Sequence, residues 1–139
     1  MTKEELLTEL KQETYAALKP SPIHGIGVFA VCDIPKGCQT VFSKNTGGWI
    51  QLSFAEAEQL PAHSRAFIET YYLYDAEHYF IPDHGCKVMD MASYLNHSNT
   101  PNLISVLDGA YFETTRDIKE GEELFIDYGE IADGLDDYR

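Results

Sequence analysis

The segment from residue 96 to residue 102 concentrates polar side chains that could bind a ligand. It begins Asn96, His97, Ser98, Asn99 and ends, after a proline, at Asn102. Asparagine and histidine side chains can hydrogen-bond the edge of an adenine, or they can hold neighbouring backbone in place. A polar turn that joins two strands would have the same composition. The segment alone therefore leaves a binding site and a plain turn both open.

A second candidate is Tyr128, which stands beside a glycine at the end of the segment 121–129. A tyrosine hydroxyl can position a nucleophile or act as a general acid or base. A single tyrosine at the end of a strand-like run is also common as a half-buried core residue. Tyr128 by itself therefore indicates chemistry only weakly.

A third candidate is the glycine pair Gly25 and Gly27 in the segment 24–30. A dinucleotide-binding loop needs a strand before its glycines and a helix after them. Here Pro20 and Pro22 precede the pair and a strand-like run follows it, which excludes that kind of site. The two glycines still allow a close approach of the backbone to a ligand.

In this order, the three segments together resemble the SET domain family of protein lysine methyltransferases. The GxG turn of that family is matched at 25–27, its central NHS and PN residues at 96–102, and its last motif, GEEL followed by DYG, at 121–129. The resemblance covers residues from about 20 to 130. It identifies the chain as similar to a minimal SET protein.

The resemblance implies a mainly β fold with short helices, a β-clip-like SET domain of small curved sheets with a C-terminal pseudoknot. We expect residues 1–19 to form an N-terminal helix, residues 20–130 the SET domain and residues 131–139 an acidic C-terminal tail. The knot-like arrangement would bring Asn96 and Tyr128 to one site, although they are far apart in sequence.

The resemblance also implies a cofactor, S-adenosyl-L-methionine. The cofactor would lie against the GxG turn, with the NHS segment near its adenine, and Tyr128 would be the catalytic residue that orients a lysine amine. The implied cofactor-binding residues are His24, Gly25, Ile26, Gly27, Asn96, His97 and Tyr128.

We expect the walls of the lysine channel to come mainly from the aromatic residues after position 70, with Ile126 as an additional candidate. The candidates are Tyr71, Tyr72, Tyr74, Tyr79 and Ile126, and ordinary hairpin packing is the alternative for each tyrosine. Since Ile126 lacks a hydroxyl, it points weakly to a roomier site and to multiple methylation.

The chain departs from the family pattern in three respects. Ser93 stands where the motif has arginine, Asn99 where it has cysteine, and we expect no cysteine-rich post-SET segment. The channel wall would then come from elsewhere, in some proteins from a partner subunit. These departures motivate a second hypothesis, a catalytically silent SET fold that acts as a protein-binding module. A methyl acceptor other than lysine is a third.

Metal binding is not expected from the spacing of the possible ligands. His63, His78 and His84 match no ligand pattern, and the three cysteines contain no CxxC pair. We therefore predict no metal and no disulfide framework.

The net charge of −13, from 23 acidic and 10 basic residues, would repel nucleic acid and attract a basic protein. A lysine-bearing protein or peptide, histone-like or ribosomal, is thus the expected partner. The charged N-terminus excludes a signal peptide, and no apolar run has membrane-spanning length. We expect a soluble, cytoplasmic protein, with the nucleus left open, and a homodimer as a hypothesis.

Hydrophobic spacing and turn residues predict the elements that must position these groups. They are a helix over 2–18 capped by Thr2, a hairpin over 25–42, a loop over 45–48, a helix over 53–70 capped by Ser53 and split at Pro61, a hairpin over 71–82, a hairpin over 103–118 around Asp108 and Gly109, and a last strand over 123–129.

Overall fold

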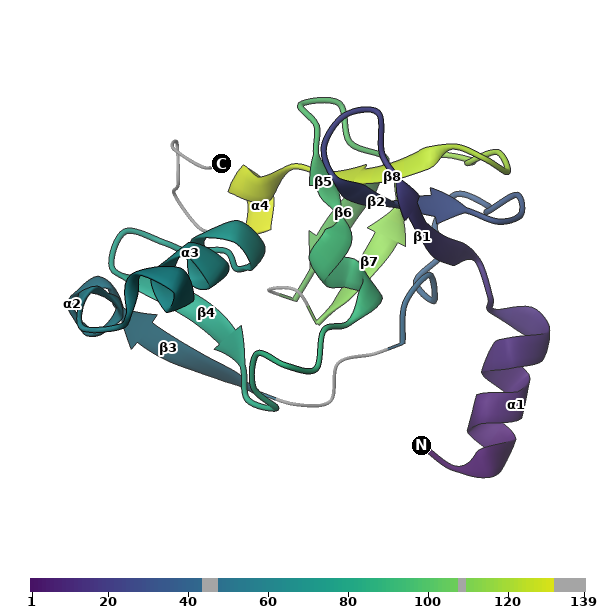
Figure 1. The fold of residues 1–139 in the computed structure, drawn as a ribbon. Coiled ribbons are helices and arrows are strands. Elements are labelled where there is room, and N and C mark those ends of the chain that lie inside the picture. The colour runs from purple at the N-terminus through teal and green to yellow at the C-terminus, as the bar shows by residue number, and fades with distance from the viewer. Residues whose placement is uncertain (44–47, 108–109, 132–139) are drawn as a thin grey trace.

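The computed structural model describes residues 1–43, 48–107 and 110–131. Short strands dominate, which confirms a mainly β fold with short helices (Figure 1). The elements are α1 (Lys3–Gln12), β1 (Ala16–Pro20), β2 (Ile26–Ala30), β3 (Trp49–Ser53), α2 (Phe54–Glu58), α3 (Ala62–Tyr71), β4 (His78–Pro82), the 3-10 helix η1 (Met91–Tyr94), β5 (Asn96–His97), β6 (Leu103–Val106), β7 (Tyr111–Thr114), β8 (Glu123–Ile126) and α4 (Tyr128–Ile131).

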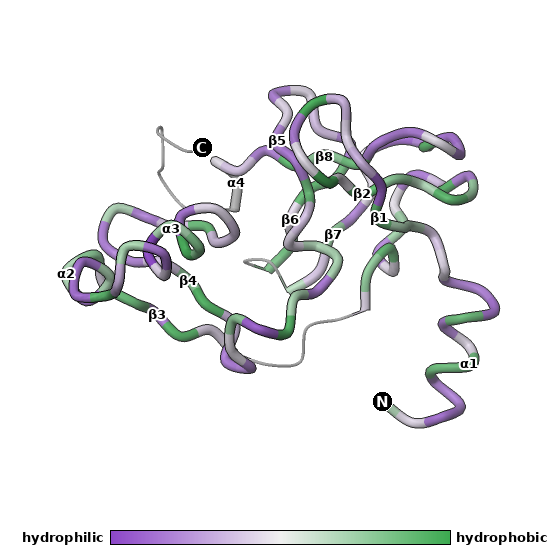
Figure 2. Tube along the Cα trace, viewed as in Figure 1, coloured by the Kyte–Doolittle hydropathy of each residue, from purple (hydrophilic) through white to green (hydrophobic). Residues whose placement is uncertain are grey.

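The main sheet has the strand order β1-β2-β8-β5. Its inner pair, β2 and β8, is antiparallel, whereas β5 runs parallel to β8 with Asn96 opposite Phe125. The core under this sheet holds the largest fully buried side chains, among them Val28, Leu103 and Leu124. Figure 2 shows hydrophobic stretches in β2 and β8, whereas β5, formed by Asn96 and His97, is hydrophilic. Burial of this apolar surface is what holds the distant segments together.

A second, smaller lobe is built from α2, α3 and the two-stranded sheet β3-β4. Its own apolar cluster centres on Ile68, Tyr72 and Ile81. The predicted cap is confirmed, because Ser53 and Glu56 form a reciprocal capping box. The predicted split is confirmed as well, since α2 ends before Pro61 and α3 starts after it.

The predicted hairpin after residue 102 is also confirmed, as β6 and β7 pair antiparallel with Leu103 opposite Thr114. Its turn residues 108–109 lie outside the described residues, as do most of the predicted loop 45–48 and the predicted tail from residue 132 onward.

The N-terminal helix is shorter than the sequence suggested. Thr2 caps it as expected, its Oγ1 accepting from the Glu5 amide at 3.1 Å, but the helix ends at Gln12. Residues 16–20 form β1 instead, because they hydrogen-bond along β2. We predicted a helix over 2–18 and a helical segment over 1–19. Both predictions were wrong after residue 12.

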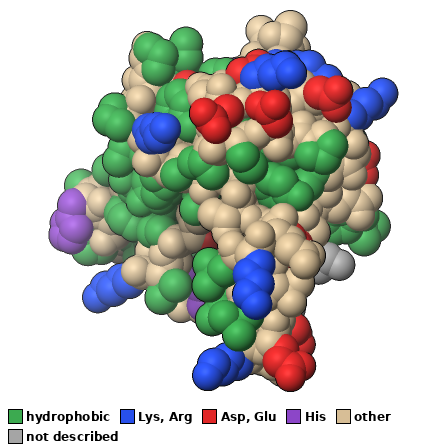
Figure 3. All heavy atoms as spheres, turned by 90° about the vertical axis from the view of Figure 1, so that its right-hand side faces the viewer, with side chains coloured by type: hydrophobic (Ala, Val, Ile, Leu, Met, Phe, Trp, Pro, Cys, Tyr) green, Lys and Arg blue, Asp and Glu red, His purple; other side chains and the backbone are tan. Residues whose placement is uncertain are grey.

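Helix α1 lies at the edge of the molecule, on the side that Figure 3 shows. None of its residues is buried, and its apolar side chains Leu6, Leu7 and Leu10 stay exposed. A hydrogen bond of 2.6 Å from Ser43 Oγ to Glu9 Oε1 links the helix to the body.

Two predicted hairpins have different partners in the structure. After β2, residues 38–42 form no strand, and the segment is instead joined to β7, where the Thr114 amide donates to the Cys38 carbonyl at 3.0 Å. Strand β4 exists, but it pairs with β3 over its whole length. The hairpin expected over 71–82 survives as a bridge between Tyr74 and Tyr79. The prediction over 25–42 was wrong because pairing with distant segments replaced local pairing. The prediction over 71–82 is confirmed for residues 73–80, where the Phe80 amide donates to the Leu73 carbonyl at 3.0 Å.

Among the described residues, every helix is too short or too polar to cross a bilayer.

The buried amide of Asn102 generates a stability prediction. Its Nδ2 donates to the Glu123 carbonyl at 2.9 Å, and its Oδ1 accepts from the Phe125 amide at 2.8 Å. Asn102→Ala leaves two backbone groups of β8 without these partners, so the free energy of unfolding should fall by about 2–4 kcal/mol in urea denaturation. The matched control is Asn99→Ala at an exposed position, which should cost much less. Equal losses in the two variants would contradict this role of Asn102.

Candidate functional site

A wide pocket of about 1840 Å³ opens between the main sheet and the smaller lobe. The loop before β2, β5 and the start of α4 line one side of it, and the end of α3 lines the other. Most of the predicted site residues meet here: His24, Gly25, Ile26, Tyr71, Tyr72, Asn96, His97, Ile126 and Tyr128. A pocket of this kind, apolar with a few converging polar groups, is the usual form of a small-molecule site.

Asn96 is buried, and its amide has a fixed direction. Nδ2 donates to the His24 carbonyl at 3.0 Å and to Glu123 Oε2 at 2.8 Å. Since both acceptors require a donor, the network assigns the NH₂ group to the inner side. Both amide hydrogens are then used within the protein. The remaining group, Oδ1, can only accept, so Asn96 is suited to a ligand that donates a hydrogen bond.

The loop before β2 is held by Ser21. Its hydroxyl lies 2.8 and 2.9 Å from the two carboxylate oxygens of Glu123, and it accepts from the amides of Ile23 and His24. Gly25 has a φ of +49°, a conformation that favours glycine. The result is an exposed backbone turn at the mouth of the pocket.

Tyr128 lies at the point where β8 passes into α4. Its Oη donates to the Leu95 carbonyl at 2.7 Å, and its backbone amide donates to His97 Nδ1 at 3.2 Å. Nδ1 is therefore an acceptor, which places the proton of the neutral imidazole on Nε2, 3.0 Å from Asn99 Oδ1. These bonds fix the tyrosine ring against His97, at a centroid distance of 5.3 Å.

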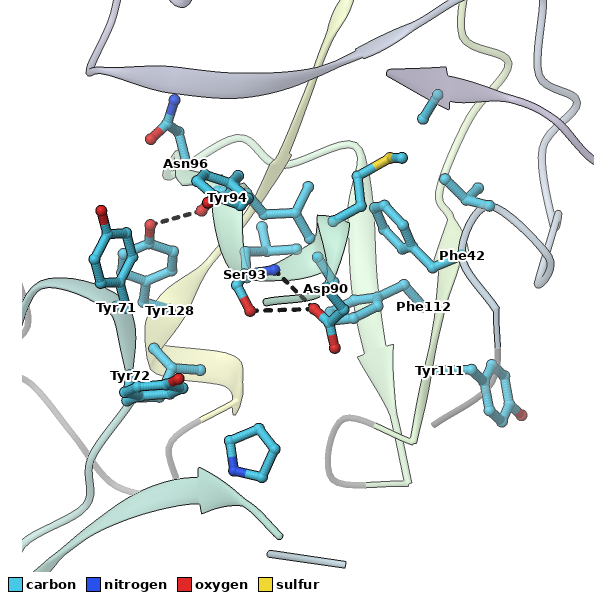
Figure 4. A pocket seen from close by; sticks show the side chains of 18 of the residues that line it. Phe42, Tyr71, Tyr72, Asp90, Ser93, Tyr94, Asn96, Tyr111, Phe112 and Tyr128 are labelled. Atoms are coloured by element: carbon cyan, nitrogen blue, oxygen red, sulfur yellow. Dashed lines mark hydrogen bonds between the residues drawn. The ribbon is translucent and has the colours of Figure 1, made fainter. Parts of the chain in front are cut away.

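Aromatic side chains surround Tyr128. Figure 4 shows Tyr71, Tyr72 and Tyr94 gathered on its side of the pocket. The Tyr71 and Tyr94 rings make an edge contact at 6.2 Å. Tyr72 is 4% exposed and donates to Met89 Sδ at 3.6 Å. Burial, followed by the neighbouring Cys86, raises the pKa of Tyr72 above its ordinary value.

Three predicted residues do not reach the pocket. Tyr74 and Tyr79 pack with Phe54, at centroid distances of 6.1 and 5.2 Å, so the structure separates them from the other candidates. Gly27 is buried behind the turn. A Cβ added there would collide with the carboxylate of Glu123, which explains why this position holds a glycine without any ligand contact.

Four contributors to the site were missed in the sequence. Ser21 and Glu123 form the network behind Asn96, the Leu95 carbonyl anchors Tyr128, and Tyr94 adds an aromatic ring beside Tyr71. Glu123 lies inside the GEEL motif, so the motif offered a signal. Its partners, Ser21 and Asn96, could not be identified without the three-dimensional pairing of the segments.

The pocket is negatively charged. Of the described residues that line it, six are carboxylates and none is lysine or arginine. The six are Glu9, Glu13, Glu69, Asp75, Asp83 and Asp90. An open cleft lined by one sign of charge draws ligands of the opposite sign, so this pocket favours a cation.

Within the described part of the chain, no group of three histidine, cysteine or carboxylate side chains is placed to hold a metal ion. Cys32, Cys38 and Cys86 are free thiols.

Comparisons with known proteins agree with this geometry. The model of the SET domain family matches residues 25–129. Among solved structures, a candidate histone methyltransferase of Plasmodium falciparum gives a TM-score of 0.50 at 18% identity, over 84% of this chain and 95% of that chain. A chain of the apo ctPRC2 structure with mutations in Ezh2 gives 0.60 at 23% identity, over 95% of this chain and 18% of that chain. At such identities the likeness shows the fold. Comparison with curated protein sequences gave no match.

The raised pKa of Tyr72 predicts a specific alkaline behaviour. Because the folded pKa lies above the unfolded pKa of about 10, this tyrosine stabilises the fold below that pH, and its contribution is lost as the pH rises toward the folded pKa. Wild-type stability in urea should therefore fall more steeply above pH 10 than that of Tyr72→Phe. At pH 7 to 8 the two curves should run parallel. Identical slopes above pH 10 would refute the buried, neutral tyrosine.

Proposed function

This chain belongs to the SET domain family, and from that membership and the geometry of its pocket we propose that it transfers a methyl group from S-adenosyl-L-methionine to a lysine side chain of a protein. The observation that carries the proposal is the meeting of Asn96, His97 and Tyr128 at one end of a cation-favouring pocket. The pairing of β5 with β8 brings residues 96–97 and 128 together.

The residues of this pocket fit the cofactor. Asn96 Oδ1 is an acceptor on the pocket side and suits an amino group, and the turn at Gly25 exposes backbone for close contact. S-adenosyl-L-methionine carries a positive sulfonium, which agrees with the acidic lining. When bound, it supplies an electrophilic methyl group. His24, Gly25 and Ile26 would hold it with Asn96 and His97.

The protein's own part is to present a neutral amine in a fixed direction. A free lysine has a pKa of about 10.4 and is mostly protonated at neutral pH. The aromatic wall of Tyr71, Tyr94 and Tyr128 disfavours the charged form by desolvation. Tyr128 Oη donates its hydrogen bond to the Leu95 carbonyl, so its oxygen remains available as an acceptor for an amine N–H. That bond leaves the nitrogen lone pair to point away from the tyrosine.

The carboxylates around the pocket support a basic protein or peptide as the substrate. Their charges would raise the local concentration of a lysine-rich segment. A cytoplasmic location and a homodimer stay predictions. So does the number of methyl groups, for which Ile126 is buried beside the site without a hydroxyl.

Replacing Tyr128 tests the reaction. Tyr128→Phe removes the hydroxyl that would orient the amine, so methyl transfer from labelled S-adenosyl-L-methionine to a mixture of basic proteins should fall about 100-fold. The label is located by mass spectrometry, which also counts the methyl groups. Tyr74→Phe is the matched control, because its ring packs on Phe54 outside the pocket, and it should transfer at the wild-type rate.

Two further outcomes separate the competing hypotheses. Equal transfer by Tyr128→Phe and wild type would remove Tyr128 from the reaction. A wild-type protein whose thermal unfolding is not shifted by S-adenosyl-L-methionine, and which labels nothing, would instead fit a silent binding module, because a ligand of the native state must raise its stability.

A further inference from the structure

One carboxylate joins three segments that are far apart in sequence. Glu123 projects from β8 and accepts from Ser21 Oγ at 2.8 and 2.9 Å and from Asn96 Nδ2 at 2.8 Å. Ser21 belongs to the loop before β2, and Asn96 opens β5. Among the described residues, no lysine, arginine or histidine forms an ion pair with Glu123. The carboxylate is therefore stabilised by neutral donors alone.

The absence of a side chain at Gly27 leaves room for this carboxylate. Gly27 lies on the strand next to Glu123, and a Cβ at that position would overlap Oε2 and would lie 3.1 Å from Asn96 Nδ2. No positive φ demands a glycine at position 27. Position 27 therefore holds a glycine because the contact between Glu123 and Asn96 needs the space, and not because the backbone conformation requires one.

The contact decides which end of the Asn96 amide faces the pocket. As long as Glu123 and the His24 carbonyl both accept from Nδ2, Oδ1 is turned to the pocket. Without the carboxylate, one N–H loses its acceptor and the amide can rotate and present NH₂ instead. A ligand amino group would then meet a donor rather than an acceptor. Ser21 would also lose the group that anchors the loop 21–25.

We propose that Glu123 is a positioning residue that sets the polarity of Asn96 and fixes the loop 21–25 for cofactor binding. This proposal rests on the proposed function. Packing of β8 does not need the carboxylate, because Leu124 and Ile126 are the residues of this strand that enter the core. Loss of the carboxylate should therefore weaken binding much more than folding.

The test is the Kd for S-adenosyl-L-methionine, measured by isothermal titration calorimetry on three variants of the full chain. Glu123→Gln keeps the size but replaces one acceptor oxygen by a donor, and Gly27→Ala displaces the carboxylate without removing it. Each should raise Kd about tenfold, the effect of losing a hydrogen bond to a charged group. The matched control is Glu122→Gln, which breaks bonds to Arg116 and Lys119 at the surface and should bind like the wild type.

Two additional readouts separate positioning from a general loss of structure. In turnover assays the KM for the cofactor should rise while kcat at saturating cofactor changes less than about twofold. In a Glu123→Ala background, the further change Gly27→Ala should raise Kd little, because the group it displaces is already gone. Additive losses from the two changes would overturn the proposal.

The outcomes remain distinct from those of the proposed function. A wild-type chain that does not bind S-adenosyl-L-methionine contradicts the cofactor assignment itself. Wild-type binding, together with unchanged Kd in Glu123→Gln and Gly27→Ala, overturns only the role of Glu123. If Glu123→Gln fails to fold by circular dichroism, Gly27→Ala decides the question, since the displaced carboxylate is the flexible end of a side chain.

Discussion

The parallel pairing of β5 with β8 is the contact on which the site depends. Two residues of β5 lie beside β8, and Ser98 extends the pairing by donating to the Ile126 carbonyl at 2.9 Å. Asn102 adds two further bonds to β8. Segments some thirty residues apart are thereby held side by side (Figure 1). The same pairing brings Asn96, His97 and Tyr128 to one pocket, so stability and chemistry share one set of bonds.

Polarity is distributed over the pocket in a way that suits a positively charged ligand and a lysine. Inner hydrogen bonds use the donors of Asn96 and Tyr128 and leave their oxygens as acceptors. Six carboxylates line the pocket, and Tyr71, Tyr72 and Tyr94 gather on the side of Tyr128. The carboxylates attract a positively charged ligand. The aromatic rings would desolvate a lysine amine that lies beside Tyr128.

Local signals in the sequence predicted the locally determined features. The caps at Thr2 and Ser53, the break at Pro61 and the hairpin after residue 102 depend on neighbours a few residues away, and all are present. Residues 16–20 were mispredicted as helix because they form a hairpin with β2 across residues 21–25. The local hairpin around Tyr74 and Tyr79 is present, but β4 takes its full-length partner, β3, from an earlier part of the chain. The tyrosine run shows the same limit. Its spacing could not tell that Tyr71 and Tyr72 face the pocket while Tyr74 and Tyr79 pack on Phe54. The motifs located Asn96, His97 and Tyr128, but the Glu123 contact required the fold.

The most direct test of the central claim is a crystal structure of the full chain with S-adenosylhomocysteine, the demethylated form of the proposed cofactor. We expect the ligand against the backbone of residues 24–26, with a ligand donor on Asn96 Oδ1 and the thioether facing the ring of Tyr128. A ligand bound elsewhere, or Asn96 turned to present its NH₂ group, would contradict the account of how the β5-β8 pairing forms the site.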